Sequence, residues 1–296
     1  MQSCVVLYES LYLLIRKEQE MIENKDIIHQ YRKYQHGLIY KGAAHTETKL
    51  NDIEARQLLK SYNALFVRNV YDWDCKEETS FWYVIQDSPI GMDSLHSKCR
   101  NQVRRSYKTL QFRMLEVNLL GGVIDDLYLV YSQAFRRYKI QTSQPMAKAS
   151  FTSHVLNVSK IADFWGAFDN ETGKLIAYAE VVIQGESAKY TALKAIPEEM
   201  NRTYPFYGLL FEMNRYYIEE KNFLYVTDGA RSITEHSNIQ SFLDKFNFRR
   251  AYCHFKVTYV WWLGLIVKML YPLRSIIHNQ KLTFLLRQEA INRGEY

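Results

Sequence analysis

Two carboxylates stand inside segments whose other residues are typical of buried strands. Glu180 lies in "IAYAEVV", and Asp228 stands near the end of "FLYVTDG". Ligands of α/β sheets collect near the ends of strands, which favours Asp228 as a neighbour of a bound molecule. A carboxylate in such a place can accept a proton from an attacking amine or hydroxyl. The structural alternative for each residue is a hydrogen-bonded turn or an edge-strand charge, so both are candidates for catalysis.

A second group of candidates is basic and follows one predicted helix in "SLHSKCRNQVRRSYKTL". Arg100, Arg104 and Lys108 recur every fourth residue, and Lys98 widens the same face. Arginine presents a planar fork of donors that fits phosphate or carboxylate groups. The alternative is a solvated helix face paired with acidic neighbours such as Glu116. Lys98, Arg100 and Arg104 are therefore candidate anion-binding residues.

A third region combines a basic residue, an aromatic turn and a long amphipathic helix in "RTYPFYGLLFEMNRYYIEEKN". The N-terminus of a helix can bind phosphate through its free N–H groups, with Arg202 close by. Pro205 lacks an N–H, and the side chain of Tyr207 obstructs a close approach. Arg202 and Tyr207 are candidate binding residues in this turn, and Arg231, after "TDG", is a further one.

Composition narrows the class of protein. The chain of 296 residues is 47% hydrophobic, and its net charge of +6 suits an anionic small-molecule or lipid-linked substrate. That charge is too small to indicate nucleic acid, and no specific nucleic-acid motif is present. Its 4 cysteines are far apart and its 8 histidines have no metal-binding spacing, so we expect no metal and no disulfide framework. A reducing cytoplasm is the expected location.

Strand-like and helix-like segments alternate along the chain, which predicts an α/β protein with a mixed sheet. Asn51 is a predicted helix start, and Asp93 and Ser94 are predicted caps of the basic helix. The clearest stretch, residues 163–195, has β-rich runs separated by "DNETGK" and "QGES", and predicts a three-strand meander. The helix that begins near Pro205, the strand "FLYVTDG", a short helix and a last strand follow.

From residue 163 to 257 this order resembles the core of the GNAT acyltransferase superfamily. The segment "SKCRNQVRRSYK" is similar to the basic helix "R-x-x-[IV]-R-[KR]" of Fem-type peptidoglycan aminoacyltransferases, which are built from GNAT-like units. The resemblance implies a GNAT-like fold with two such units, of which the C-terminal one is more complete. We expect residues 1–110 to form a partial unit, 111–258 the acyltransferase domain and 259–296 a helical tail.

The chain departs from the GNAT pattern at two sites. A GNAT loop that binds acetyl-CoA reads [QR]-x-x-G-x-[GA], whereas here Arg202, Pro205 and Tyr207 take the corresponding positions. Leu243 stands where a GNAT tyrosine often protonates the leaving thiolate, and Asn247 replaces a glycine in a turn. Fem-type relatives also depart from the standard loop, so both changes favour that branch.

The resemblance implies an acyltransferase that moves an acyl or aminoacyl group to an amine or hydroxyl of a sugar or cell-envelope precursor. Glu180 and Asp228 are the expected catalytic carboxylates, and acyl-CoA or aminoacyl-tRNA is the expected donor. Two alternatives stay open. One is a conventional N-acetyltransferase that uses acetyl-CoA, and the other is a catalytically inactive module that binds an anionic glycan or lipid-linked precursor.

The tail contains an apolar, Trp-containing segment with basic residues nearby. It resembles an interfacial amphipathic helix, and its apolar stretch is too short and too interrupted to span a membrane. We expect peripheral membrane contact through residues 258–282, on the inner face, and the alternative is packing against the body of the protein or a second subunit. The residues concerned are Trp261, Trp262, Leu265, Ile266, Lys268, Leu270, Arg274 and Lys281. The apolar N-terminal segment has no basic stretch before it, so we expect it to belong to the fold.

Overall fold

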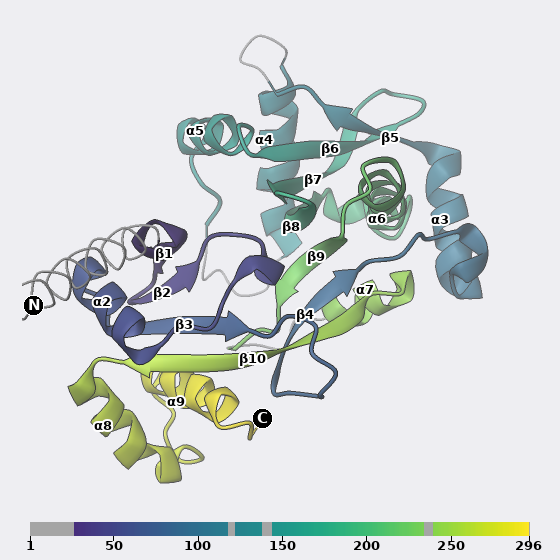
Figure 1. Cartoon of the computed structure of the whole chain (residues 1–296). Coiled ribbons are helices and arrows are strands. Elements are labelled where there is room, and N and C mark those ends of the chain that lie inside the picture. The colour runs from purple at the N-terminus through teal and green to yellow at the C-terminus, as the bar shows by residue number, and fades with distance from the viewer. Residues whose placement is uncertain (1–26, 118–121, 138–143, 234–238, 296) are drawn as a thin grey trace, which may run out of the picture. The chain divides into compact units, whose positions relative to one another are not determined.

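The computed structural model describes residues 27–117, 122–137, 144–233 and 239–295 (Figure 1). The chain forms two compact units. The first contains residues 1–82, 232–235 and 251–296, and the second contains residues 83–231 and 236–250. The N-terminal apolar segment predicted to join the fold lies outside the described residues. The domain limits expected from the sequence, residues 1–110, 111–258 and 259–296, stay predictions.

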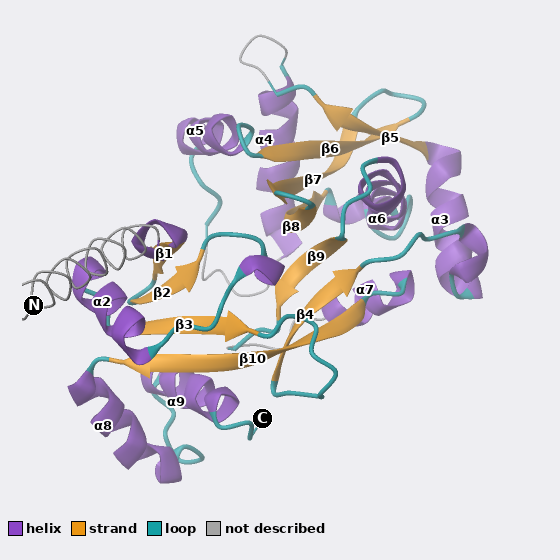
Figure 2. Cartoon of the chain, viewed as in Figure 1, coloured by secondary structure: helices purple, strands orange, loops and turns teal. Residues whose placement is uncertain are grey.

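The first unit contains a small mixed sheet covered by helices (Figure 2). Strands β1 (Tyr31–Tyr34) and β2 (Gly37–Tyr40) form a hairpin, β2 runs parallel to β3 (Phe66–Tyr71), and β10 (Arg249–Tyr259) pairs antiparallel with β3. Helix α2 (Asp52–Tyr62) packs Leu58 and Leu59 into the core of this unit.

Helix α2 begins where the sequence predicts. The Asn51 side chain accepts hydrogen bonds from the backbone N–H groups of Ile53 and Glu54, and the Glu54 carboxylate accepts one from the Asn51 N–H. This reciprocal capping satisfies donors that a helix start leaves free. The helix ends at Asn63, which adopts a left-handed conformation with φ 46°.

Two further helices complete the first unit. Helix α8 (Trp261–Leu270) leads through a 3₁₀ turn (Tyr271–Leu273) to α9 (Gln280–Asn292). They share a small core of Leu263, Val267, Tyr271, Leu286 and Ala290. One side of α8 is thus fixed against α9.

The second unit is built on a sheet whose order is β4-β9-β8-β7-β6-β5. Its centre is the predicted antiparallel meander of β6 (Ala162–Asp169), β7 (Leu175–Gln184) and β8 (Ser187–Ala195). Strand β5 (Leu110–Leu115) pairs antiparallel with β6 at one edge. At the other side, β8 runs parallel to β9 (Tyr225–Ala230), which pairs antiparallel with β4 (Phe81–Gln86).

Helices pack on both faces of this sheet. Helices α4 (Val123–Ala134) and α5 (Lys148–Val158) enclose one core with Phe164 and Tyr178. Residues of opposite parity face the other side, where the Trp165 indole donates to the Tyr217 hydroxyl at 3.0 Å. Tyr217 belongs to a π-helical turn (Tyr216–Glu220) that continues α6 (Pro205–Arg215). The short helix α7 (Ile239–Leu243) precedes β10.

The basic helix α3 (Ser97–Thr109) begins later than predicted. Asp93 and Ser94, expected as its caps, lie in a separate 3₁₀ turn (Met92–Ser94), and His96 stands at the N-cap without a side-chain hydrogen bond. The Ser94 hydroxyl bonds within its own turn, to the Gly91 carbonyl. The predicted caps are therefore wrong.

Candidate functional site

Strands β8 and β9 separate part-way along their length. They pair only over Ser187–Lys189 and Tyr225–Thr227, although β8 continues to Ala195 and β9 to Ala230. Beyond the paired residues, no strand of the described part of the chain pairs with β8 on that side. We call this opening between the two strands the fork.

Each strand of the fork carries a β-bulge where the separation begins. On β8, Thr191 is the extra residue, because Glu180 lies opposite Ala192 and Val181 lies opposite Tyr190. On β9, the extra residue is Asp228, which lies between the partners of two adjacent β4 residues. Bulges increase the local twist and redirect side chains. The two bulges therefore explain both the divergence of the strands and the position of Asp228 at their junction.

The Asp228 bulge is held by its neighbours in the strand. The Thr227 hydroxyl donates to the Val84 carbonyl at 2.8 Å and accepts the Gly229 N–H at 2.9 Å. Gly229 has φ +103°, a backbone conformation that residues other than glycine rarely adopt. The backbone around Asp228 is consequently fixed on both sides.

The Asp228 carboxylate is half-buried and accepts no hydrogen bond from any described residue. Burial raises its pKa to about 6, and the nearby Lys189 ammonium opposes that rise. The Lys189 side chain passes over Gly229, since a Cβ built there would lie 3.5 Å from Lys189 Cε. A carboxylate with spare lone pairs and a pKa near neutrality has the properties of a general base.

Glu180 lies on β7 next to the other bulge, and both of its carboxylate oxygens are engaged. Oε1 accepts from the Thr191 hydroxyl at 2.7 Å, and Oε2 lies 3.1 Å from His154 Nε2. Glu180 is buried, whereas the His154 side chain, on α5, is 41% exposed. Glu180 can therefore orient His154 and leave the second ring nitrogen open to other partners.

Behind the fork lies a buried polar pair. The Tyr190 hydroxyl, on β8, donates to Asn214 Oδ1, on α6, and both residues are buried. The Asn214 Nδ2 group is buried without a hydrogen-bond partner among the described residues. Unpaired buried donors are uncommon in proteins, so this amide is an unusual polar group in the core behind β8.

The turn before α6 has little free capacity for phosphate. Arg202 is bidentate to the Glu199 carboxylate, at 2.9 Å for both hydrogen bonds. Pro205 is the first helical residue, so it presents no N–H there. Tyr207 packs its ring on Phe242 and Phe246.

Gly208, in the first turn of α6, allows close packing. A Cβ at this position would lie 2.0 Å from Phe112 Cζ, so only glycine lets α6 approach β5 so closely.

The other basic candidates lie on separate elements. On α3, Arg100 is paired with Asp93 at 3.3 Å, while Lys98 and Arg104 are exposed. Arg231 is buried and directly follows β9, three positions after Asp228. Among the proposed site residues, Arg231 is thus the basic one nearest to Asp228 in the chain.

The segment before the last strand keeps its shape but not the usual acid. Leu243, in place of the GNAT tyrosine, is fully buried. Asn247 adopts a left-handed turn with φ 59°, as expected for a residue that replaces glycine. Among the residues that the structure describes, no group of His, Cys, Asp and Glu is arranged to hold a metal ion.

Comparison with known proteins bears on the fold alone. No protein-family model matches the sequence, and no curated protein matches it. Among solved structures, the C-terminal domain (DUF2156) of a proposed lysylphosphatidylglycerol synthetase from Agrobacterium fabrum superposes with a TM-score of 0.51 at 9% identity. The match covers 81% of this chain and 82% of that one. The chain has a GNAT-type fold.

Two other solved structures have lower scores. L-PGS from Bacillus licheniformis has a TM-score of 0.47 at 11% identity, over 89% of this chain and 85% of its own. FemX has a TM-score of 0.44 at 11% identity, over 67% of this chain and 66% of its own. The α/β fold with a mixed sheet predicted from the sequence is confirmed by the arrangement of the strands and by the DUF2156 structure.

Four residues of the fork region were missed from the sequence: His154, Lys189, Thr191 and Asn214. Lys189, in the strand-like run "SAKYTALKA", was the one visible signal, since charged residues are rarely placed in such strands without a partner. The roles of the others depend on bulges and on contacts between segments distant in sequence, which no local pattern carries.

Proposed function

We propose that the protein is an acyltransferase whose reaction takes place at the fork, with Asp228 as general base. The observation that supports this most is the half-buried Asp228 carboxylate, which has no hydrogen-bond partner among the described residues. A structural carboxylate at such a depth is normally hydrogen-bonded, because burial of an unpaired charge is unfavourable. Asp228 retains that unfavourable placement at the point where β8 and β9 separate.

In the proposed reaction, the amine or hydroxyl of the acceptor attacks the carbonyl carbon of the acyl donor. Asp228 takes the proton of the attacking group, the new C–N or C–O bond forms, and the bond from the carbonyl carbon to the donor's carrier breaks. The leaving thiolate or alkoxide is protonated through water by the proton that Asp228 has taken, which restores the carboxylate. The backbone groups along the open edge of β8 can form hydrogen bonds with an extended, amide-containing arm of the donor, in the way that they would with an added strand.

Glu180 has a positioning role in this proposal. Thr191 and His154 occupy its two oxygens, so it orients the His154 ring rather than taking a proton from the acceptor. Lys98, Arg100, Arg104 and Arg231 bind anionic groups of donor or acceptor, while Tyr207 and the Glu199-paired Arg202 line the turn.

For the donor, we favour an aminoacyl-tRNA, or an acyl-CoA held chiefly through its acyl arm. The turn before α6 offers poor pyrophosphate binding, since Pro205 lacks an N–H and Arg202 is already paired. For the acceptor we favour a sugar or lipid-linked cell-envelope precursor, reached from the cytoplasmic side of the membrane. The positive net charge suits such an anionic substrate.

A transfer assay with a donor panel tests the proposal. The purified protein is incubated with acetyl-CoA, longer acyl-CoA species or aminoacyl-tRNA, each with amino-sugar nucleotides and lipid-linked envelope precursors, and acylated products are identified by mass spectrometry. We expect transfer from at least one donor and a loss of about 10²–10⁴-fold in Asp228→Asn. Glu47→Gln, which alters another buried carboxyl group, is the matched control and should keep full activity.

Two results would overturn the proposal. The first is an absence of transfer from every donor together with intact binding of a precursor, which would favour a catalytically inactive binding module. The second is an Asp228→Asn variant as active as the unchanged protein. Transfer from acetyl-CoA alone would instead identify a conventional N-acetyltransferase and remove the preference for another donor.

A further inference from the structure

Helix α8 is apolar on two opposite sides, and only one of them packs against other described residues of the first unit. Leu263 and Val267 are buried against α9. On the other side, Trp261, Leu265 and Met269 recur every fourth residue and are 78%, 55% and 68% exposed. A helix that is apolar around its circumference normally has a partner on each side.

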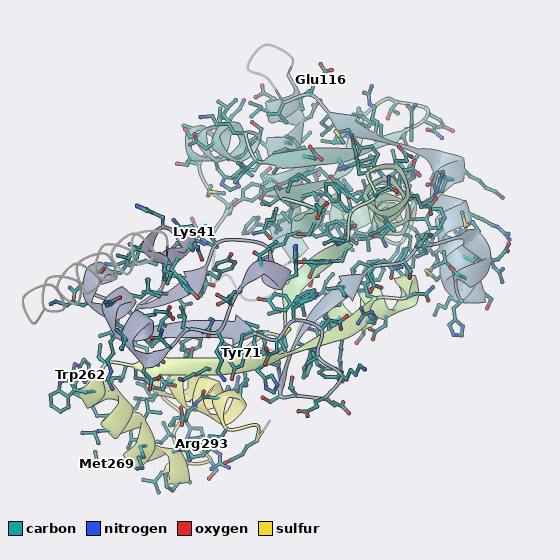
Figure 3. The ribbon with its side chains drawn as sticks, in the orientation of Figure 1. Lys41, Tyr71, Glu116, Trp262, Met269 and Arg293 are labelled. Atoms are coloured by element: carbon teal, nitrogen blue, oxygen red, sulfur yellow. The ribbon has the colours of Figure 1, made fainter. Side chains whose placement is uncertain are left out.

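The exposed apolar surface continues past the helix. We define the α8 face as Trp261, Trp262, Leu265, Met269, Leu273 and Ile276, all of which are exposed. Trp262 and Met269 are both carried by α8 (Figure 3). Exposed hydrophobic residues that gather in one place usually mark an interaction surface, whereas single ones do not.

The charges around this face are of one sign. From residue 258 to 287 the sequence has four basic residues, Lys268, Arg274, Lys281 and Arg287, and no Asp or Glu. Lys268 and Lys281 are exposed, and neither forms an ion pair with a described residue. These two lysines are the cations best placed to meet an external anion.

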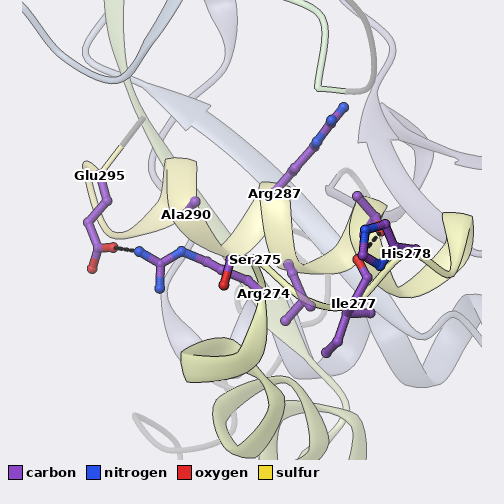
Figure 4. A pocket seen from close by; sticks show the side chains of 9 residues that line it. Arg274, Ser275, Ile277, His278, Arg287, Ala290 and Glu295 are labelled. Carbon is purple, nitrogen blue, oxygen red and sulfur yellow. Dashed lines mark hydrogen bonds and ion pairs between the residues drawn. The ribbon is translucent and has the colours of Figure 1, made fainter.

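Arg274 has a different role. It lies at a cavity of 410 Å³ lined by residues of the segment between α8 and α9 and of α9 itself, and its guanidinium is 3.2 Å from the Glu295 carboxylate (Figure 4). Its guanidinium also lies over the Tyr271 ring, 4.4 Å from the centroid. Arg274 therefore joins Glu295, just after α9, to the turn that follows α8, and its charge is not free for an external anion.

We propose that the α8 face docks on the surface of an anionic lipid bilayer, with α8 lying in the plane of the interface. Trp261 and Trp262 suit the level of the headgroups, where one end of the indole is apolar and the other is hydrated. The aliphatic side chains enter the acyl boundary, and Lys268 and Lys281 meet the phosphates of anionic lipids.

Charge disfavours a second copy of the chain as the partner. A symmetric dimer through the α8 face would bring the same patch of both copies together, including Lys268 and Lys281 of each. Like charges at such an interface repel each other.

Within the part of the chain that the structure describes, no helix combines the length and apolarity needed to cross a membrane.

Co-sedimentation with vesicles tests the docking proposal, with the full chain and vesicles of phosphatidylcholine alone or with 30% phosphatidylglycerol as probes. We expect binding to the anionic vesicles and at least tenfold weaker binding to the neutral ones. The variant Trp261→Ser/Leu265→Ser/Met269→Ser should bind at least about 100-fold more weakly, because three side chains no longer enter the apolar layer. Lys268→Gln/Lys281→Gln should lose about 25-fold, roughly fivefold for each charge near the surface.

Matched controls separate the α8 face from general effects. Ile53→Ser/Leu129→Ser/Ile161→Ser removes three comparably exposed apolar side chains outside α8, and Lys60→Gln/Lys160→Gln removes two exposed lysines elsewhere. Both controls should bind as the unchanged protein does. Equal binding to neutral and anionic vesicles, no binding to either, or equal losses in the controls would overturn the proposal. Sedimentation that shows a dimer broken by the α8 triple variant would overturn it in favour of self-association.

Discussion

Two carboxyl groups, a buried one in the first unit and a half-buried one in the second, have raised pKa values for the same reason but have different surroundings. Burial raises the pKa of Glu47 to about 7 and that of Asp228 to about 6. Glu47 Oε1 accepts three hydrogen bonds: from the Tyr31 hydroxyl, the Asn69 amide and the Val70 N–H, at 3.2, 3.1 and 3.1 Å. Asp228 accepts none from the described residues.

The difference shows that a raised pKa does not by itself identify a functional site. Glu47 joins the segment before α2 to β3, and its partners account for its burial. Asp228 has a similar shift without any such partner, so its placement gives no structural benefit that the described residues reveal. The set of hydrogen-bond partners, rather than the pKa, separates the structural carboxyl group from the candidate base.

The largest expected effect on stability comes from removing the carboxyl group of Glu47. Glu47→Leu leaves the Tyr31 hydroxyl and the Val70 N–H without their acceptor, and each unpaired buried donor costs about 1–3 kcal/mol. We expect the free energy of unfolding at pH 5 to fall by about 3–5 kcal/mol in urea titrations. Asp228→Asn should not destabilise the protein under the same conditions. A Glu47→Leu variant of normal stability would remove the contrast between the two sites.

The next effect has the opposite sign. Because the folded-state pKa of Asp228 lies above the ordinary value of 3.8, the folded state keeps a proton that the unfolded state has lost between about pH 4 and 6. This carboxyl group therefore lowers stability as the pH rises through that window. Asp228→Asn should be more stable than the unchanged protein at pH 8, by up to about 3 kcal/mol, with the gain absent below pH 4. A loss of stability at pH 8 would show that Asp228 has a structural partner.

A smaller effect is expected at His154, which Glu180 orients. His154→Gln should lower kcat for acyl transfer about tenfold, less than the roughly 10²–10⁴-fold effect of a direct acid or base, and leave the melting temperature within about 2 °C. Glu180→Gln should lower kcat by a similar factor, since the His154 ring loses the carboxylate that orients it. Unchanged rates in both variants would assign the pair a purely structural role.

The smallest effect is expected in the turn before α6. Arg202→Gln removes a guanidinium that already binds Glu199, so the KM for the donor should change less than twofold. Lys174→Gln, an exposed lysine elsewhere in the same unit, serves as the control. A tenfold rise in KM for Arg202→Gln alone would show that Arg202 leaves Glu199 to bind the donor, and would restore the turn as a phosphate site.

The helices and strands of the second unit could be predicted because their signals are local. The two turn clusters fix the meander, and the capping residues around Asn51 fix the start of α2 in the first unit. The partner of Arg202 could also have been foreseen, since Glu199 stands three positions away in the sequence. The caps expected at Asp93 and Ser94 were wrong because a separate turn uses those residues.

The fork could not be predicted in the same way. The bulge at Thr191 exists only in the register between β7 and β8, and that at Asp228 only in the register between β4 and β9, whose segments are more than 130 residues apart. The pairing of Glu180 with His154 likewise joins a strand and a helix 26 residues apart. Sequence reasoning selected both carboxylates from their strands, but it could not show that one is fully paired and the other is not.

The most direct test of the account is the pH dependence of kcat/KM for acyl transfer by the Asp228→Asn variant, beside the unchanged protein and Glu47→Gln. With a base at the fork, the rate of the unchanged protein should rise with pH and level off above about 6, as the Asp228 carboxyl group loses its proton. Glu47→Gln should keep that profile, and Asp228→Asn should lose it together with most of the rate. An Asp228→Asn variant that keeps the same rise near pH 6, at a rate within twofold of the unchanged protein, would contradict the account.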